Sequence, residues 1–156
     1  MQISSATSQL RTTDLAGSIR FYTTKVGLTL EFQYQDFYAG IRAGNQLFHL
    51  KLVDEKDPSI EFVDKGELFH LYLETDDVEA AADALKKNGV RLVKDPHETA
   101  WGTREFVIKD DQGHTCTSVK VDRLLASRYP PLARAGELRR LDGSSRSVIT
   151  KRKGLR

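Results

Sequence analysis

Apolar and polar residues alternate over residues 5–12, which predicts a β-strand with one buried face. Asp14 follows this strand, and its carboxylate can accept hydrogen bonds from the free amides of a first helical turn. The next apolar residues have the spacing of a half-buried helix, and Gly27 suits the left-handed backbone on which many helices end. Three further strands are then expected, at residues 28–35, 37–42 and 46–53.

The same order of elements returns in the second half of the chain. A strand is expected over residues 68–75, and a helix capped by Asp76 or Asp77 ends at Asn88-Gly89. Strands near residues 90–93, 103–109 and 114–121 complete this second unit, with a turn at residues 110–113 between the last two. A short helix is expected near residues 132–141, beyond the unit.

The two units also match residue by residue. Thr13, Asp14, Lys25 and Gly27 recur 62 positions later as Thr75, Asp76, Lys87 and Gly89. We therefore expect one α+β domain of pseudo-symmetric βαβββ modules, with its ligand site where the modules meet. The expected boundaries are residues 1–122 for the domain, with module one at 5–53, a polar linker at 54–66 and module two at 67–121. Within the linker, Asp57-Pro58 and Lys65-Gly66 are expected to break regular structure.

The charge changes sign along the chain. Residues 1–122 carry 14 Lys and Arg against 20 Asp and Glu, whereas residues 123–156 carry 10 against 2. We expect a basic C-terminal extension that is solvated or docks on an acidic surface of its own or a partner subunit. Its basic run, Lys151-Arg152-Lys153, lacks interleaved aromatics, so nucleic acid is not an expected partner.

Other bulk features favour the cytoplasm. No apolar run reaches about 18 residues, so no membrane partner is expected, and the N-terminus lacks the pattern of a signal peptide. The single cysteine, Cys116, cannot form an internal disulfide and is expected in the core.

Two stretches resemble the vicinal oxygen chelate superfamily, which includes glyoxalase I, bleomycin resistance proteins and extradiol dioxygenases. Residues 10–22 (LRTTDLAGSIRFY) resemble its opening motif, and residues 101–106 (WGTREF) with 110–113 (DDQG) resemble its ending. The resemblance implies an open barrel-like mixed sheet, the glyoxalase/bleomycin-resistance fold. It also implies a homodimer with ligand sites built from both chains.

The metal-dependent members of this superfamily place four ligands in the cavity. The matching positions here are Thr7, His49, His70 and Thr117. Two imidazoles and two hydroxyls without a carboxylate make a poor site for a divalent ion, so no cofactor is expected. If a metal binds at all, His49 and His70 are its expected ligands.

We expect the two histidines to face one cavity and to act as polar anchors for a small molecule. Taken singly, each is more often a strand histidine satisfied by water or a neighbour than a ligand-binding residue, and strand aromatics are more often core or interface than ligand platforms. The expected ligand-binding residues are Phe32, Tyr38, His49, His70, Tyr72, Trp101 and Thr117.

The predicted function is that of a metal-free, bleomycin resistance-like binding protein for an aromatic or amphipathic molecule. One alternative is an enzyme, namely a lyase, isomerase or dioxygenase-like member that uses His49 and His70 with an atypical metal site. Another is a scaffold with a vestigial cleft, whose extension recruits an acidic partner.

Overall fold

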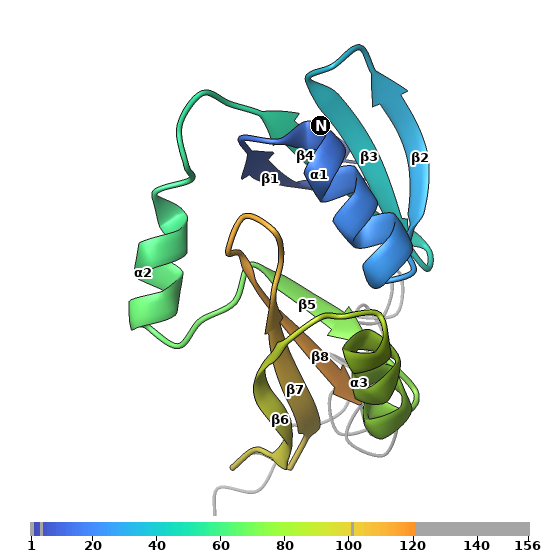
Figure 1. Cartoon of the computed structure of the whole chain (residues 1–156), viewed down its shortest axis with the longest axis vertical. Coiled ribbons are helices and arrows are strands. Elements are labelled where there is room, and N and C mark those ends of the chain that lie inside the picture. Colours follow the sequence, from blue (N-terminus) through green and yellow to red (C-terminus); the bar gives the residue numbers. More distant parts are fainter. Residues whose placement is uncertain (1, 4, 101, 121–156) are drawn as a thin grey trace, which may run out of the picture. The chain divides into compact units, whose positions relative to one another are not determined.

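A computed structural model describes residues 2–3, 5–100 and 102–120 of the chain (Figure 1). Trp101, the basic extension at 123–156 and a short helix expected near 132–141 lie outside the described residues. Within those that are described, no helix combines the length and the apolar character needed to cross a membrane.

Module one has the predicted βαβββ order. Asp14 accepts a hydrogen bond from the Gly17 amide at 2.9 Å and so caps the first helix, as predicted. Gly27 adopts a φ of +84°, a conformation that residues with a side chain disfavour. The elements are β1 (Ser8–Thr12), α1 (Leu15–Arg20), the π-helical turn η1 (Phe21–Lys25), β2 (Thr29–Tyr34), β3 (Tyr38–Ala43) and β4 (Gln46–Leu52).

Module two repeats this order. Asp77 caps its helix by accepting from the Ala80 amide at 2.9 Å, which resolves the choice between Asp76 and Asp77. The elements are β5 (Leu71–Glu74), α3 (Val78–Lys87), β6 (Leu92–Glu98), β7 (Arg104–Lys109) and β8 (Thr115–Lys120).

The connection between the modules contains a helix that the sequence pattern did not predict. Helix α2 (Ser59–Lys65) begins directly after Asp57-Pro58, which had been interpreted as a breaker. Proline is tolerated at a helix start because it has no N–H to leave unpaired there, and Asp57 accepts from the Ser59 amide at 2.9 Å. The same two residues therefore start a helix rather than exclude one.

The eight strands form two four-stranded sheets, in the orders β1-β4-β3-β2 and β5-β8-β7-β6. In each sheet the first strand runs parallel to the last, and the other neighbours are antiparallel. The fold is therefore the expected α+β pair of modules with an open arrangement and no closed barrel. Corresponding registers pair Gln9 with His49 in one sheet and Tyr72 with Thr117 in the other.

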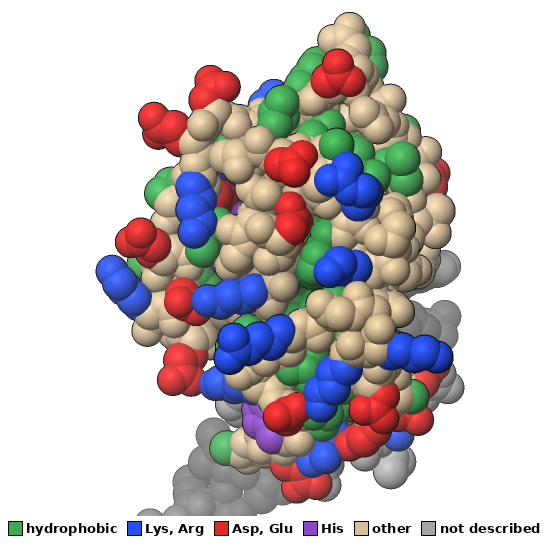
Figure 2. All heavy atoms as spheres, in the orientation of Figure 1, with side chains coloured by type: hydrophobic (Ala, Val, Ile, Leu, Met, Phe, Trp, Pro, Cys, Tyr) green, Lys and Arg blue, Asp and Glu red, His purple; other side chains and the backbone are tan. Residues whose placement is uncertain are grey.

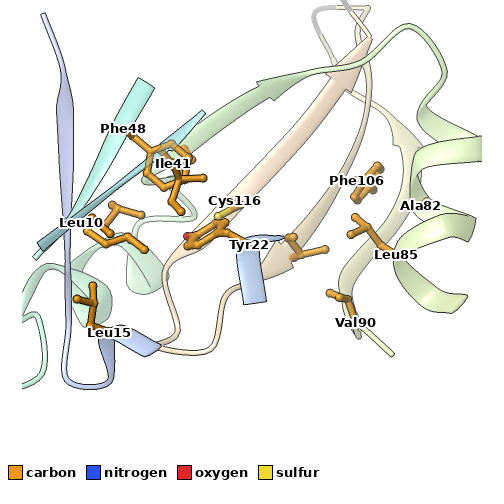
Figure 3. Close-up of a cluster of buried hydrophobic side chains, with 14 of the residues drawn as sticks. Leu10, Leu15, Tyr22, Ile41, Phe48, Ala82, Leu85, Val90, Phe106 and Cys116 are labelled. Atoms are coloured by element: carbon orange, nitrogen blue, oxygen red, sulfur yellow. The ribbon is translucent and has the colours of Figure 1, made fainter. Parts of the chain in front are cut away.

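One hydrophobic core joins the modules. Tyr22 and Cys116 lie at its centre, between a module-one group around Ile41 and a module-two group around Phe106 (Figure 3). Alternation along the strands predicts an apolar inner face, and of its residues Leu10, Phe48, Leu50, Leu71 and Cys116 are buried whereas Leu73 is half-buried. Burial raises the pKa of the Cys116 thiol to about 12, with a further contribution from the Asp110 charge, so Cys116 is a core residue as predicted.

Candidate functional site

Three of the predicted ligand-binding residues form one cluster on the first sheet. Phe32, Tyr38 and His49 lie on β2, β3 and β4, and the His49 ring meets Phe32 and Tyr38 edge-on at centroid distances of 5.4 and 5.2 Å. The Phe32 ring lies over Gly40, where a Cβ atom would overlap it. This close approach explains why the strand beneath the ring carries a glycine.

Hydrogen bonds fix the orientation of this cluster, which we call the aromatic cluster (Phe32, Tyr38 and His49). The Tyr38 hydroxyl lies 2.7 Å from His49 Nδ1 and accepts from the Gln9 side-chain amide at 3.1 Å. When this hydroxyl donates to Nδ1, His49 carries its proton on Nε2. That atom is buried and has no hydrogen-bond partner among the described residues. The aromatic cluster therefore contains one buried ring nitrogen that no described residue satisfies.

His70 has a different environment, at the start of β5. Its Nδ1 accepts a hydrogen bond from the Thr115 amide at 3.0 Å, and its Nε2 lies 3.2 Å from the Ser59 hydroxyl. Burial lowers the pKa of His70, and the neighbouring His114 lowers it further, against the opposing charges of Asp57 and Asp110. No hydrogen bond or ring contact in the described part of the chain joins His70 to the aromatic cluster.

A pocket of about 230 Å³ opens on the second sheet. We call it the module-two pocket. It contains two predicted ligand-binding residues, Tyr72 and Thr117, which are neighbours across β5 and β8. Its other lining residues come from the α2–β5 connection and strands β6 to β8: Val63, Asp64, Glu67, Leu68, Phe69, Val93, Lys94, Glu105, Val107, Lys109 and Thr115.

A larger hollow of about 700 Å³ lies between β5 and the first sheet. Its walls are the β3–β4 turn with the start of β4 on one side, and residues 70–74 on the other. His70 and Tyr72 therefore border the junction of the modules, where the repeat predicts the ligand site. Thr7 lies just ahead of β1 and is exposed.

The sequence interpretation missed a buried polar chain next to His70. Asp110 had been interpreted only as a turn residue, yet its Oδ2 accepts from the Tyr22 hydroxyl at 2.7 Å and lies 2.8 Å from His114 Nδ1. Burial alone would raise the pKa of Asp110. The hydrogen bond and charge of His114, together with the hydrogen bond from Tyr22, outweigh the effect of burial, so the pKa of Asp110 is lowered. The His114 ring packs edge-on against His70 at 4.9 Å. The signal for this chain is weak, because a histidine after a turn glycine has many ordinary explanations.

Of the four positions that match the superfamily's metal ligands, His70 has both ring nitrogens within hydrogen-bond distance of other groups. A nitrogen that accepts a hydrogen bond has no lone pair left for a metal, and one that donates carries a proton instead. His70 uses Nδ1 to accept from Thr115, so in the neutral ring Nε2 carries the proton toward Ser59. Among the described residues, no group of three or more His, Cys, Asp or Glu side chains is arranged to hold an ion.

The architecture defines a class of protein built from paired βαβββ modules with open four-stranded sheets. The sequence matches the family model "Glyoxalase/Bleomycin resistance protein/Dioxygenase superfamily" over residues 3–116. The chain belongs to this superfamily, which confirms the resemblance. Among curated proteins, none matches the chain in sequence.

Solved structures share this fold at low sequence identity. A bleomycin-binding protein complexed with bleomycin is 17% identical, with a TM-score of 0.60, and the match covers 77% of this chain and 100% of that one. A bleomycin resistance determinant encoded on the transposon Tn5 is 17% identical, with a TM-score of 0.62 and coverage of 77% and 99%. A glyoxalase/bleomycin resistance protein/dioxygenase from Alicyclobacillus acidocaldarius is also 17% identical, with a TM-score of 0.62 and coverage of 80% and 98%. At this identity the likeness establishes the fold alone.

Proposed function

We propose that this protein binds a small aromatic or amphipathic molecule without a metal ion. The module-two pocket carries the proposal, because it combines apolar walls with a few convergent polar groups, as small-molecule sites generally do. A structural neighbour with the same fold is a bleomycin-binding protein, which supports a binding role for this scaffold.

A pocket of about 230 Å³ is smaller than the roughly 300–1,000 Å³ of typical ligand sites, so a second surface is needed to cover a larger ligand. The aromatic cluster offers such a surface. Phe32 is 37% exposed, and Tyr34 and Phe37 beside it are 58% and 37% exposed. Exposed apolar patches of this kind commonly mark interaction sites. We propose a homodimer in which the aromatic cluster of one chain covers the module-two pocket of its partner.

Ligand binding is tested by screening aromatic drugs and metabolites against ¹⁵N-labelled protein by NMR. A ligand should perturb amides around both Tyr72 and His49, and Phe32→Ala and His49→Ala should weaken its binding. Phe62→Ala is the matched control, since Phe62 is 72% exposed on α2 and does not line the pocket. A ligand whose affinity is unchanged by both site variants would contradict the proposed site.

The dimer is tested by sedimentation of the full chain and of a chain ending at residue 122. If the basic extension braces the dimer, the shorter chain will dissociate at a higher concentration. A monomeric full chain at every concentration would exclude the proposed arrangement.

Metal content is measured on protein purified without a histidine tag. We expect less than stoichiometric iron, manganese, nickel or zinc, and about one tightly held ion per chain would favour the enzymatic alternative instead. We also propose a cytoplasmic location, in keeping with the buried free thiol of Cys116.

A further inference from the structure

The floor of the module-two pocket contains an unsatisfied hydroxyl. Thr115 is only 7% exposed, and its Oγ1 has no hydrogen-bond partner among the described residues. A buried polar atom without a partner costs free energy, so such an atom in a pocket calls for a ligand group to pair with it. Thr115 lines this pocket beside Thr117, which is equally buried.

The charges around the pocket do not balance. Lys109 is paired with Asp64 at 2.7 Å, and Lys94 is paired with Glu67 at 3.1 Å. The remaining carboxylate that lines the pocket is Glu105, whose side chain is 13% exposed. Within the described part of the chain, the cationic group found near it is His97 Nε2 at 3.7 Å, which is charged only when the ring is protonated. The pocket lining therefore contains three carboxylates against two lysines, and Glu105 is the sheltered carboxylate that neither lysine pairs with.

Acidic and basic side chains lie interspersed over the lower half of the face in Figure 2, with hydrophobic patches between them. Sheltering a carboxylate from water is costly unless a positive group pairs with it. A cationic ligand group would supply that pairing at Glu105.

The walls determine the size and character of the rest of the ligand. Phe69 and Tyr72 form an aromatic pair at 5.2 Å, and Leu68, Val93 and Val107 add aliphatic surface. A cavity of 150 Å³ holds benzene, so about 230 Å³ suits one ring with a short arm. Aromatic walls also attract cations through the faces of their rings.

We propose that the module-two pocket selects a compact aromatic amine, whose ammonium group pairs with Glu105 and whose polar arm bonds the Thr115 hydroxyl. This inference rests on the proposed binding function and specifies the class of ligand. It assigns Glu105 and Thr115, neither of which is among the ligand-binding residues expected from the sequence, as specificity-determining residues.

The test uses three probes of similar shape and different charge: 2-phenylethylamine, 2-phenylethanol and 3-phenylpropionate. Their affinities for the full chain are measured at pH 7.5 by NMR titration. A charge-assisted hydrogen bond contributes more binding free energy than a neutral one. The amine should therefore bind about tenfold more tightly than the alcohol, and the carboxylate should bind most weakly.

Glu105→Gln should remove this preference while the alcohol still binds, and Glu98→Gln, at an exposed position on β6, should preserve it. Glu105 and Thr115 lie four register positions apart on β7 and β8, so the Thr115 contact is tested with tyramine, which adds a ring hydroxyl to 2-phenylethylamine. Thr115→Val, which keeps the side-chain shape, should weaken tyramine by about two- to tenfold and leave 2-phenylethylamine unchanged. The native NMR spectrum of each variant confirms folding, and Glu105→Ala replaces Glu105→Gln if the latter does not fold.

Three results would overturn the inference. These are alcohol or carboxylate binding as tight as amine binding, an amine preference that survives Glu105→Gln, and perturbation of amides away from the pocket. If none of the probes binds, the assigned ligand class is wrong. The proposed function is judged separately, by whether the broad screen finds any ligand.

Discussion

Single residues connect the two modules through a chain of buried polar groups. Tyr22 comes from module one, whereas Asp110 and His114 come from module two, and all three are nine-tenths buried or more. Burial raises the pKa of Tyr22 well above its usual value, assisted by Cys116 and Asp110, so its hydroxyl stays protonated and donates to the carboxylate. A hydrogen bond to a buried charge is among the more stabilising kinds.

Tyr22→Phe removes this donor and preserves the ring. We expect a loss of about 1.5–3 kcal/mol in the free energy of unfolding, measured by urea denaturation. Tyr34→Phe is the control, because Tyr34 is 58% exposed, and it should change stability by less than about 0.5 kcal/mol. Equal effects of the two substitutions would mean that the bond to Asp110 contributes nothing.

His70 gives the folded protein a dependence on pH. Its pKa is lower in the folded state than in the unfolded chain, so the unfolded chain binds a proton first as the pH falls. This contribution to stability is complete above about pH 6.5 and is lost as the pH falls from there through the folded-state pKa, by at most about 1.4 kcal/mol per pH unit.

His70→Asn keeps an acceptor for the Thr115 amide and removes the titration. Urea midpoints between pH 7.5 and 5 should therefore fall less steeply for this variant than for the wild type. Parallel slopes for the wild type and His70→Asn would contradict this account.

At this scale the sequence pattern predicted strand faces well and individual partners poorly. Alternation places His49 on the face where it meets Tyr38, and it places Cys116 in the core. It cannot show that Ser59 and Thr115 engage both nitrogens of His70, because those contacts join distant segments. For the same reason, the sequence pattern did not indicate the contacts of Glu105 and His114.

The helix ends are determined by local signals that can be identified in the sequence. Asp14 and Asp77 occupy equivalent N-cap positions, and the helices end near Gly27 and Gly89, both with positive φ. These signals are local, so the repeat and its helices could be predicted closely. Helix α2 was missed because Asp57-Pro58 is compatible with both a break and a helix start.

The N-cap of α3 allows a test with an adjacent control. Asp77→Ala removes the acceptor of the Ala80 amide and should cost about 1 kcal/mol of stability. Asp76→Ala removes the same charge one position earlier, where no cap is formed, and should cost less than about half as much. Urea denaturation of both variants measures the difference, and equal losses would show that charge rather than capping matters.

Across residues 2–120, the modules behave as one structural unit. They share the core around Tyr22 and Cys116 (Figure 3). Two further side-chain hydrogen bonds support the Tyr22–Asp110 bond between them. Ser18 donates to Asp111 at 2.8 Å, and the Thr13 amide donates to Gln112 at 2.9 Å. A shared core makes separate unfolding costly, because either module alone would expose apolar surface that the other covers.

We therefore expect a destabilising substitution in module two to lower the stability of module one as well. Leu85→Ala in α3 truncates a side chain that is 7% exposed and should cost about 2–5 kcal/mol. The amides to compare are those of α1 and α3 that exchange only when the whole protein unfolds. If the two modules unfold together, the substitution will accelerate hydrogen exchange of both sets by the same factor. Lys87→Ala at the exposed end of α3 is the control and should leave α1 exchange unchanged. Faster exchange in α3 with unchanged protection in α1 would show that the modules unfold independently, so the buried polar chain through Tyr22 would not couple them.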